Sequence, residues 1–229
     1  MPTDTAAPWA SLARRAAVHH ALGDPRRLEI VDALRLSDRT PGELAALVGT
    51  GTNLVAFHLD VLEEAGVIER TPSEGDARRR YVRLRAEVVA QLGPAPTVRA
   101  RDLLFVCTQN AARSQLAAAL WERATGRSAR SAGQRPAAAV HPLAVATAGR
   151  HGIDLTAARP HGYAAIARPP DLVVSVCDRA REAGLPFDVT ALHWSVPDPI
   201  EGGPADFEAA YEQLAARIEL LAMSLAPAA

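Results

Sequence analysis

The sequence contains no lysine and only two cysteines among its 229 residues. Every basic residue is therefore an arginine, which we attribute to codon bias rather than to a selected function. Two cysteines cannot form the framework of several disulfides that stabilises small secreted domains. In a reducing compartment, such a pair is more often catalytic or redox-active than structural.

Long apolar segments are also absent. No apolar run approaches the roughly 18 to 20 residues that a membrane-spanning helix needs, and residues 1–15 lack the apolar core of a secretion signal. With 48% hydrophobic and 22% charged residues, the composition is that of a globular protein. We therefore expect a cytoplasmic protein with no membrane partner.

The length allows two domains that each bury a core. Residues 91–100, QLGPAPTVRA, have the Gly and Pro content of a linker, and the pattern of elements changes across them. We predict an N-terminal domain over residues 1–95 and a C-terminal domain over residues 96–229.

Two helix starts are marked in the N-terminal domain. Asp24 before Pro25 is a typical N-cap, and Thr40-Pro41-Gly42-Glu43 has the spacing of a capping box. A third helix is predicted over residues 52–65, and its apolar residues at near-helical spacing are Leu54, Phe57 or Val61, and Leu62.

Two strands are predicted after these helices, over residues 67–70 and 81–85, around the polar turn 73–76. Short helices followed by a hairpin indicate an α+β winged helix-turn-helix domain. The C-terminal domain instead alternates apolar strands with helices, which indicates an α/β domain with a parallel sheet between helices. The ranges are 103–106, 116–124, 172–176, 189–194 and 207–225.

The first of these strands runs into the segment 107–114, CTQNAARS, and a helix follows at once. A loop between a strand and a helix N-terminus can point successive backbone N–H groups at one oxyanion, and the helix dipole adds positive potential there. Cys107 lies at that point, where the same field favours its thiolate. The planar guanidinium of Arg113 can donate two parallel hydrogen bonds to two oxygens of a tetrahedral anion.

The whole loop is our predicted oxyanion site. Ser114 can donate a hydrogen bond to the thiolate and Asn110 can brace the loop. The predicted oxyanion-binding residues are Thr108, Gln109, Asn110, Ala111, Ala112, Arg113 and Ser114.

Ligands of open α/β sheets bind outside the carboxyl ends of the strands. Cys107 ends the first strand, Cys177 ends the strand 172–176, and Asp198 follows the strand that reaches Trp194. We predict that these side chains share one site. A surface-turn role for Asp198 and a buried structural role for Cys177 are the alternatives.

The loop resembles the active-site loop of the low-molecular-weight phosphotyrosine phosphatase superfamily, and in particular its arsenate reductase branch. Gln115 follows the Arg-Ser pair, as in that branch, where phosphatases have Pro. The resemblance covers about residues 101–225 and includes further matching segments at 131–133, 142–154, 193–194 and 198–199. It implies a three-layer fold with a four-stranded parallel sheet.

The resemblance makes Asp198 the general acid and matches Cys177 to the second cysteine of thioredoxin-coupled arsenate reductases. Those enzymes carry a third cysteine shortly afterwards, and residues 178–186 contain none. We therefore expect Cys177 or an external thiol to resolve the adduct on Cys107. Regeneration would need thioredoxin, a glutaredoxin-type protein or a low-molecular-weight thiol, with no bound cofactor.

Residues 21–30 and 57–68 resemble the ArsR/SmtB-type winged-helix repressors over about residues 12–90. Such proteins form dimers that place one helix per subunit in the major groove, with the wing on the backbone. The resemblance implies a homodimer that binds operator DNA through the helix beginning at Thr52. The predicted contacts are Thr52, Asn53, His58, Arg78, Arg79 and Arg80.

This half also departs from the repressors. Ala56 and Asp60 stand where the family often has Ser and a basic residue, and residues 1–95 hold 12 arginines against 13 acidic residues. A net-neutral domain lacks a strong electrostatic footprint for DNA. No cysteine precedes Cys107, so the thiolate metal site of many relatives is missing and we predict no metal.

The leading hypothesis is a regulator module fused to an arsenate reductase, with arsenate or phosphate as the anion. One alternative is a transcription regulator whose enzyme-like domain senses an oxyanion or redox state without turnover. Another is a protein-tyrosine phosphatase, against which Gln115, Cys177 and the His193-Trp194 pair argue.

Overall fold

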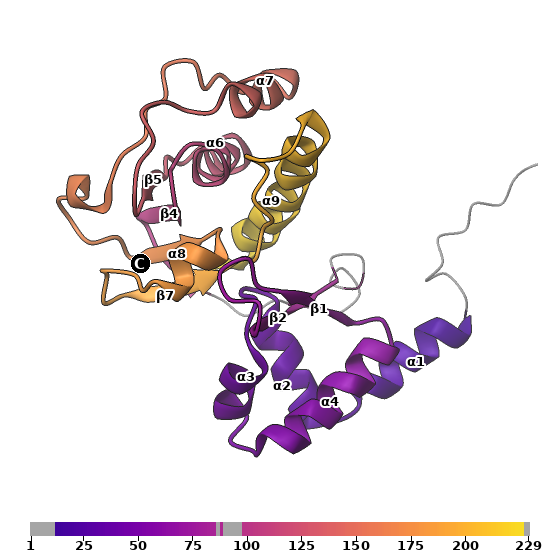
Figure 1. Cartoon of the computed structure of the whole chain (residues 1–229). Coiled ribbons are helices and arrows are strands. Elements are labelled where there is room, and N and C mark those ends of the chain that lie inside the picture. Colours follow the sequence, from indigo (N-terminus) through magenta and orange to yellow (C-terminus); the bar gives the residue numbers. More distant parts are fainter. Residues whose placement is uncertain (1–11, 86–87, 89–97, 227–229) are drawn as a thin grey trace, which may run out of the picture.

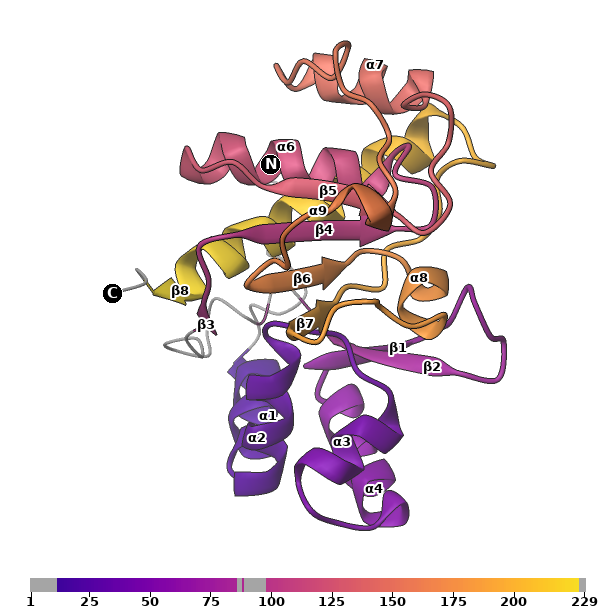
Figure 2. The ribbon, with the colours of Figure 1, turned by 90° about the vertical axis from the view of Figure 1, so that its left-hand side faces the viewer.

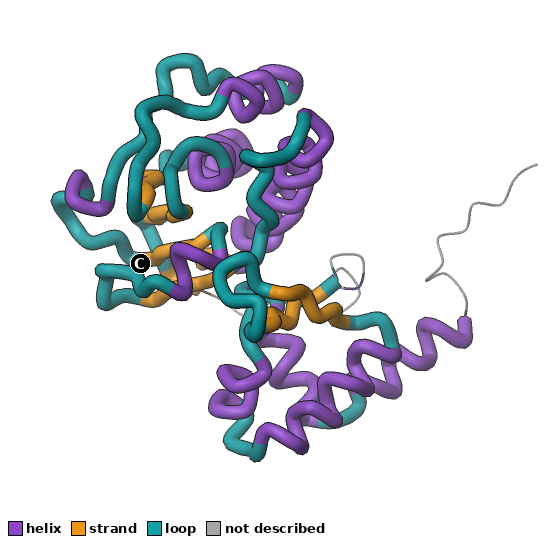
Figure 3. The backbone as a smooth tube through the Cα atoms, in the orientation of Figure 1, coloured by secondary structure: helices purple, strands orange, loops and turns teal. Residues whose placement is uncertain are grey.

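The structure is a computed structural model that describes residues 12–85, 88 and 98–226. The N-terminal half, residues 12–88, is mostly helical. In the C-terminal half, residues 98–226, a sheet forms the interior (Figures 1 and 3). The boundary predicted between residues 95 and 96 lies outside the described residues and stays a prediction.

The N-terminal half confirms the winged helix-turn-helix order. Asp24 accepts hydrogen bonds from the backbone N–H groups of Arg26 and Arg27 at 2.9 and 3.0 Å, and Thr40 forms the capping box with Glu43. The elements are α1 (Leu12–Leu22), α2 (Pro25–Leu34), α3 (Pro41–Leu47), α4 (Thr52–Glu64), and the antiparallel strands β1 (Ile68–Pro72) and β2 (Arg80–Leu84).

The buried face of α4 differs from the expected one. It consists of Val55, His58, Leu59 and Leu62, whose spacing of three, four and seven residues is that of one helix face. Leu54 and Phe57 lie off this face and are exposed, so the prediction that they belong to the apolar stripe was wrong. The stripe starts one residue later than expected.

The C-terminal half contains the predicted parallel sheet, in the order β5-β4-β6-β7 (Figure 2). Alternate residues of β4 point to opposite faces. Phe105 belongs to the core formed with the helices, whereas Leu104 packs in a smaller cluster with Tyr163 and Phe187. The strands are β4 (Leu103–Cys107), β5 (Arg130–Gly133), β6 (Leu172–Ser175) and β7 (Thr190–His193).

The helices of this half follow the predicted alternation. Residues of the three longest helices line the larger core, and α6 packs along α9. The elements are α6 (Arg113–Thr125), α7 (Pro142–Arg150), the short helix η1 (Tyr163–Ala165), α8 (Asp178–Glu182) and α9 (Pro204–Ser224).

One small pairing was not predicted: β3 (Val98–Arg99) lies parallel to β8 (Leu225–Ala226) and ties the start of this half to its end. Within the described ranges, no single helix is long and apolar enough to cross a membrane, although α3 and α4, bent by 108°, pass such a test as a pair.

The two halves meet along β7. The segment between α2 and α3 runs beside this edge strand, where the Asp38 N–H donates to the His193 carbonyl at 2.7 Å. The fully buried Asp38 carboxylate accepts the Ser195 N–H at 2.7 Å and pairs with Arg217 at 2.9 Å. Hairpin β1–β2 lies beyond β7 (Figure 2), and its turn therefore reaches the carboxyl end of the sheet.

Candidate active site

Cys107 lies where β4 ends and the loop to α6 begins, as the sequence predicts, and it is 3% exposed. Its Sγ accepts the backbone N–H of Asn110 at 3.1 Å and lies 3.0 Å from the Ser114 Oγ. Because α6 begins at Arg113, the sulfur also faces a helix N-terminus, where the dipole stabilises an anion.

The backbone around Cys107 is turned so that its amides face inward. The carbonyls of Thr108, Gln109 and Ala111 accept hydrogen bonds at 2.8, 2.9 and 2.8 Å from the N–H groups of residues 135, 137 and 141. In a planar trans peptide the N–H points opposite to the carbonyl. The following amides therefore point toward the centre of the loop, which forms a cradle for an oxyanion.

Asn110 holds the loop in a strained shape. Its φ of 51° is left-handed, and such a conformation persists only where surrounding contacts impose it. The side-chain amide donates to the Ser114 Oγ at 2.8 Å and accepts from Gln115 Nε2 at 3.1 Å and the His161 N–H at 2.8 Å. The structure thus gives Asn110 the bracing position that we predicted.

Arg113 and Asp198 meet above the cradle. The Arg113 side chain is 3% exposed, and its Nη2 lies 2.7 Å from Asp198 Oδ2. Burial disfavours the guanidinium charge, but Cys177, Asp198 and Cys107 raise the pKa of Arg113 above its usual value, so it stays cationic. The hollow between them measures about 20 Å³, and its lining residues are Cys107, Thr108, Gln109, Ala111, Ala112, Arg113, Arg179, Asp198 and Ile200.

The second cysteine is also at the site. Cys177 follows β6 as the N-cap of α8, is fully buried, and lies with its Sγ 3.1 Å from the Thr108 Oγ1. Burial raises the pKa of the Cys177 thiol, although the Arg113 charge opposes this shift. Both cysteines are free thiols. Cys177 is thus a buried neighbour of the cradle whose thiol gives up its proton less readily than an ordinary cysteine.

Sequence reasoning missed a carboxylate that comes from the other half. Glu74, in the turn between β1 and β2, accepts a hydrogen bond from Arg113 Nη1 at 3.1 Å and another from the Asp198 N–H. Burial raises the pKa of Glu74, against the pull of Arg113. No sequence pattern could have found this residue, because its place depends on how the halves pack.

Arg179 was missed as well, although it lies 3.8 Å from Asp198 and lines the hollow. Its position two residues after Cys177, near the carboxyl end of β6, could have indicated it.

Of the residues predicted to contact DNA, the structure exposes all but one. Thr52, Asn53 and the arginines 78–80 are exposed, which the prediction requires. His58 is 5% exposed, and its two ring nitrogens have no partner within the described part of the chain. Its assignment as a DNA contact was therefore wrong, because the helix turns this side chain toward the core.

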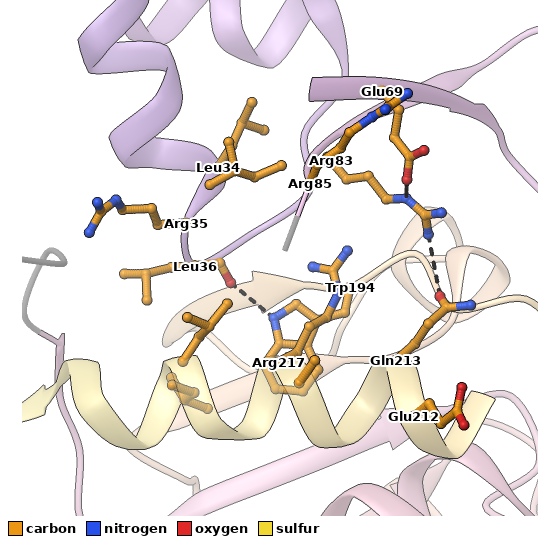
Figure 4. Close-up of a pocket in the computed structure, with 14 residues that line it drawn as sticks. Leu34, Arg35, Leu36, Glu69, Arg83, Arg85, Trp194, Glu212, Gln213 and Arg217 are labelled. Carbon is orange, nitrogen blue, oxygen red and sulfur yellow. Dashed lines mark hydrogen bonds and ion pairs between the residues drawn. The ribbon is translucent and has the colours of Figure 1, made fainter. Parts of the chain in front are cut away.

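A larger cavity of about 510 Å³ lies between the halves (Figure 4). Trp194, which donates to the Leu36 carbonyl at 3.0 Å, lies beside it with several arginines. Arg217 is paired with Asp38 and Arg83 with Glu69, so much of this charge is compensated, and no cysteine lines the cavity. Cys107 therefore marks the reactive site.

Among residues 12–85, 88 and 98–226, no group of three or more His, Cys, Asp or Glu side chains could hold a metal ion.

Two family profiles match the chain. The family described as low molecular weight phosphotyrosine protein phosphatase matches residues 102–228, and a helix-turn-helix domain matches residues 22–71. These matches confirm the predicted fusion of a helix-turn-helix domain with a domain of the low-molecular-weight phosphatase type. The comparison with curated proteins found no match.

Solved structures similar to this chain include two arsenate reductases and a tyrosine phosphatase. An arsenate reductase in its phosphate-binding state is 25% identical and matches 53% of this chain and 96% of its own, with a TM-score of 0.48. An arsenate reductase from Archaeoglobus fulgidus is 26% identical over 52% and 98% of the two chains, with a TM-score of 0.47. A tyrosine phosphatase from Erwinia amylovora is 24% identical over 54% and 92%, with a TM-score of 0.48.

Proposed function

We propose, since this chain belongs to the low molecular weight phosphotyrosine protein phosphatase family, that its C-terminal half is an arsenate reductase. The observation that carries the proposal is the pair of free thiols at one cradle: Cys107 faces the inward amides, and Cys177 is joined to the cradle through Thr108. A phosphatase requires only the first thiol. A reductase needs a second thiol to take two oxidising equivalents from arsenic.

The first step is substitution at arsenic. The Cys107 thiolate attacks arsenate held by the loop amides and Arg113, a sulfur–arsenic bond forms, and an arsenic–oxygen bond breaks. Asp198 lines the same hollow as Cys107, and in its protonated form it can protonate the departing oxygen, which leaves as water. Arsenic is still As(V) at this stage.

The second step transfers electrons. The Cys177 thiolate, or an external thiol, attacks the Cys107 sulfur, and the electron pair of the sulfur–arsenic bond passes to arsenic. Arsenite is released as As(III) and a disulfide remains. A thioredoxin, a glutaredoxin-type protein or a low-molecular-weight thiol then reduces that disulfide. Deprotonation of Cys177 is the demanding part, because burial raises the pKa of its thiol.

The test is turnover of arsenate with each of these three reducing systems, with arsenite measured by chromatography and mass spectrometry. We expect arsenite from the wild type and none from Cys107→Ser. Peptide mass spectrometry after arsenate exposure should show a Cys107–Cys177 disulfide or a thiol adduct on either residue. If no thiol donor supports turnover, the reductase assignment fails.

A sensor without turnover is the second candidate, and the contact between Glu74 and Arg113 favours it because it links the two halves. Here the N-terminal half binds operator DNA as a homodimer through Thr52, Asn53 and the exposed arginines 78–80. A gel shift with and without arsenate distinguishes the two functions: a large change in DNA affinity with negligible turnover supports the sensor. Sedimentation measures the dimer.

A protein-tyrosine phosphatase is the third candidate. Rapid hydrolysis of an aryl phosphate by the full chain, without reduction of arsenate, would support it over the reductase.

A further inference from the structure

Glu74 touches two parts of the site with one carboxylate. Its Oε2 accepts the hydrogen bond from Arg113 Nη1 at 3.1 Å, and its Oε1 accepts the backbone N–H of Asp198. The side chain of Glu74 is 21% exposed and that of Arg113 is 3% exposed, so this contact is largely shielded from water. One residue of the N-terminal half therefore holds both the anion-binding arginine and the loop that carries Asp198.

Three acceptors hold the guanidinium of Arg113 in place. Nη1 donates to Glu74 and to the Val196 carbonyl at 2.7 Å, and Nη2 pairs with Asp198. Within the described part of the chain, none of these contacts uses Nε. An anion that binds both N–H groups of the Nε–Nη2 edge would therefore share Nη2 with Asp198.

The turn that carries Glu74 is fixed against the C-terminal half. The Glu74 N–H donates to Asp178 Oδ2 at 3.0 Å, and Ser73 donates its hydroxyl to Glu182. Tyr81 lies with its hydroxyl 3.4 Å from the same Glu182 carboxylate. At Gly75, an added Cβ would come within 2.9 Å of the Glu182 Cδ. Glu74 thus reaches the site from a packed turn.

We infer that Glu74 is a positioning residue of the oxyanion site, supplied by the winged-helix half, which keeps the Arg113 guanidinium and the Asp198 loop in place for the anion. The inference rests on the proposed function only in taking the Cys107 loop as an oxyanion site. Two acceptor oxygens are required for this role. A glutamine offers one oxygen and one NH₂ group, and so satisfies only one of the two donors.

The experiment measures inorganic phosphate binding by the full chain, through protection of Cys107 from iodoacetamide followed by peptide mass spectrometry. We expect Glu74→Gln to weaken phosphate protection by about tenfold, the effect of losing one charge-assisted hydrogen bond. Glu74→Asp, which keeps both oxygens, should recover part of the affinity. Asp76→Ala is the matched control, because Asp76 lies in the same turn and its carboxylate contacts Arg78, through side chain and backbone N–H, and Arg79.

Equal or tighter phosphate binding by Glu74→Gln would overturn the inference, since the carboxylate would then be neutral or a competitor for Arg113. The inference also fails if phosphate does not protect Cys107 of the wild type from iodoacetamide. Circular dichroism should show the variant folded, and where arsenate is reduced, Glu74→Gln should lower kcat/KM for arsenate about tenfold, mainly through a higher KM. Phosphate protection without arsenite formation would refute the reductase alone and leave this test intact.

Discussion

Gly133 shows how closely the backbone packs around the cradle. A Cβ at this position would lie 2.8 Å from the Asn110 nitrogen and 2.9 Å from the Gln109 carbonyl carbon. Both neighbours are backbone atoms of the cradle, and they cannot move aside as a flexible side chain could. A larger residue here would displace the amides that face the anion.

We predict that Gly133→Ala weakens phosphate binding by at least tenfold and destabilises the fold by about 1–3 kcal/mol, the usual cost of overpacking. Phosphate protection of Cys107 and urea unfolding measure the two effects. Gly149→Ala is the control: it lies in α7, where an added Cβ meets nothing within 4 Å, and should be neutral or stabilise by up to about 1 kcal/mol. Equal behaviour of both variants would contradict the packing argument.

Asp198 gives a second prediction at this scale. Replacing it with Asn removes the proton donor but preserves the size of the side chain. Asp198→Asn should lower kcat for arsenate reduction about 100-fold, within the usual contribution of a general acid, and should still bind phosphate. Steady-state kinetics with arsenate checks this, and an unchanged kcat would remove Asp198 from the chemistry.

Single residues were predictable where their neighbours in the chain decide their position. Cys107, Asn110 and Arg113 belong to one loop, and a strand before it and a helix after it fix where that loop lies. Glu74 is 33 residues before Cys107, and its contact with Arg113 exists only because the halves pack along β7. A sequence read locally contains no information about such a contact.

Among the elements, the capped helices were the most predictable. The Thr40 Oγ1 accepts the Glu43 N–H at 3.3 Å, and the Glu43 carboxylate accepts the Thr40 N–H at 2.8 Å. The strands β3 and β8 were missed because each is two residues long and they pair between distant parts of the chain. His58 was misplaced because a shift of one residue in helical phase turns a side chain by about 100°.

We predict that Thr40→Ala lowers the free energy of unfolding by about 1 kcal/mol, because it removes the cap of α3. Urea unfolding monitored by circular dichroism measures this. Thr52→Ala provides the comparison, since Thr52 is exposed at the start of α4, a helix without a side-chain cap, and should change stability by less than about 0.5 kcal/mol. Equal losses would show that the capping box contributes nothing.

At the scale of the whole molecule, Asp178 connects both halves beneath the site. Its carboxylate lies 3.2 Å from His193 Nε2, accepts the Glu74 N–H at 3.0 Å, and accepts the Ser195 hydroxyl at 3.1 Å. Burial alone would raise the pKa of Asp178, but the contact with His193 and the two hydrogen bonds outweigh it and lower the pKa below the usual range. The ionised form is therefore the one that stabilises the native chain.

A pH-dependent stability follows. Because the folded pKa of Asp178 is lowered, its contribution is complete above the ordinary aspartate value of about 3.9 and is lost as the pH falls through the folded value. We predict that Asp178→Asn costs about 2–3 kcal/mol at pH 7 and progressively less below pH 3.9. Urea unfolding at several pH values checks this, with the exposed Asp188→Asn as a control within about 0.5 kcal/mol. A loss independent of pH would contradict it.

The segment between α2 and α3, which lies beside β7, matters when the two halves of the protein are produced separately. A strand at the border of a sheet offers unpaired peptide groups to any other chain, and proteins cover such borders to avoid aggregation. Here Asp38 supplies that cover from the N-terminal half by donating its N–H to the His193 carbonyl. We expect a C-terminal fragment produced without this segment to self-associate, because the outer edge of β7 would then be exposed.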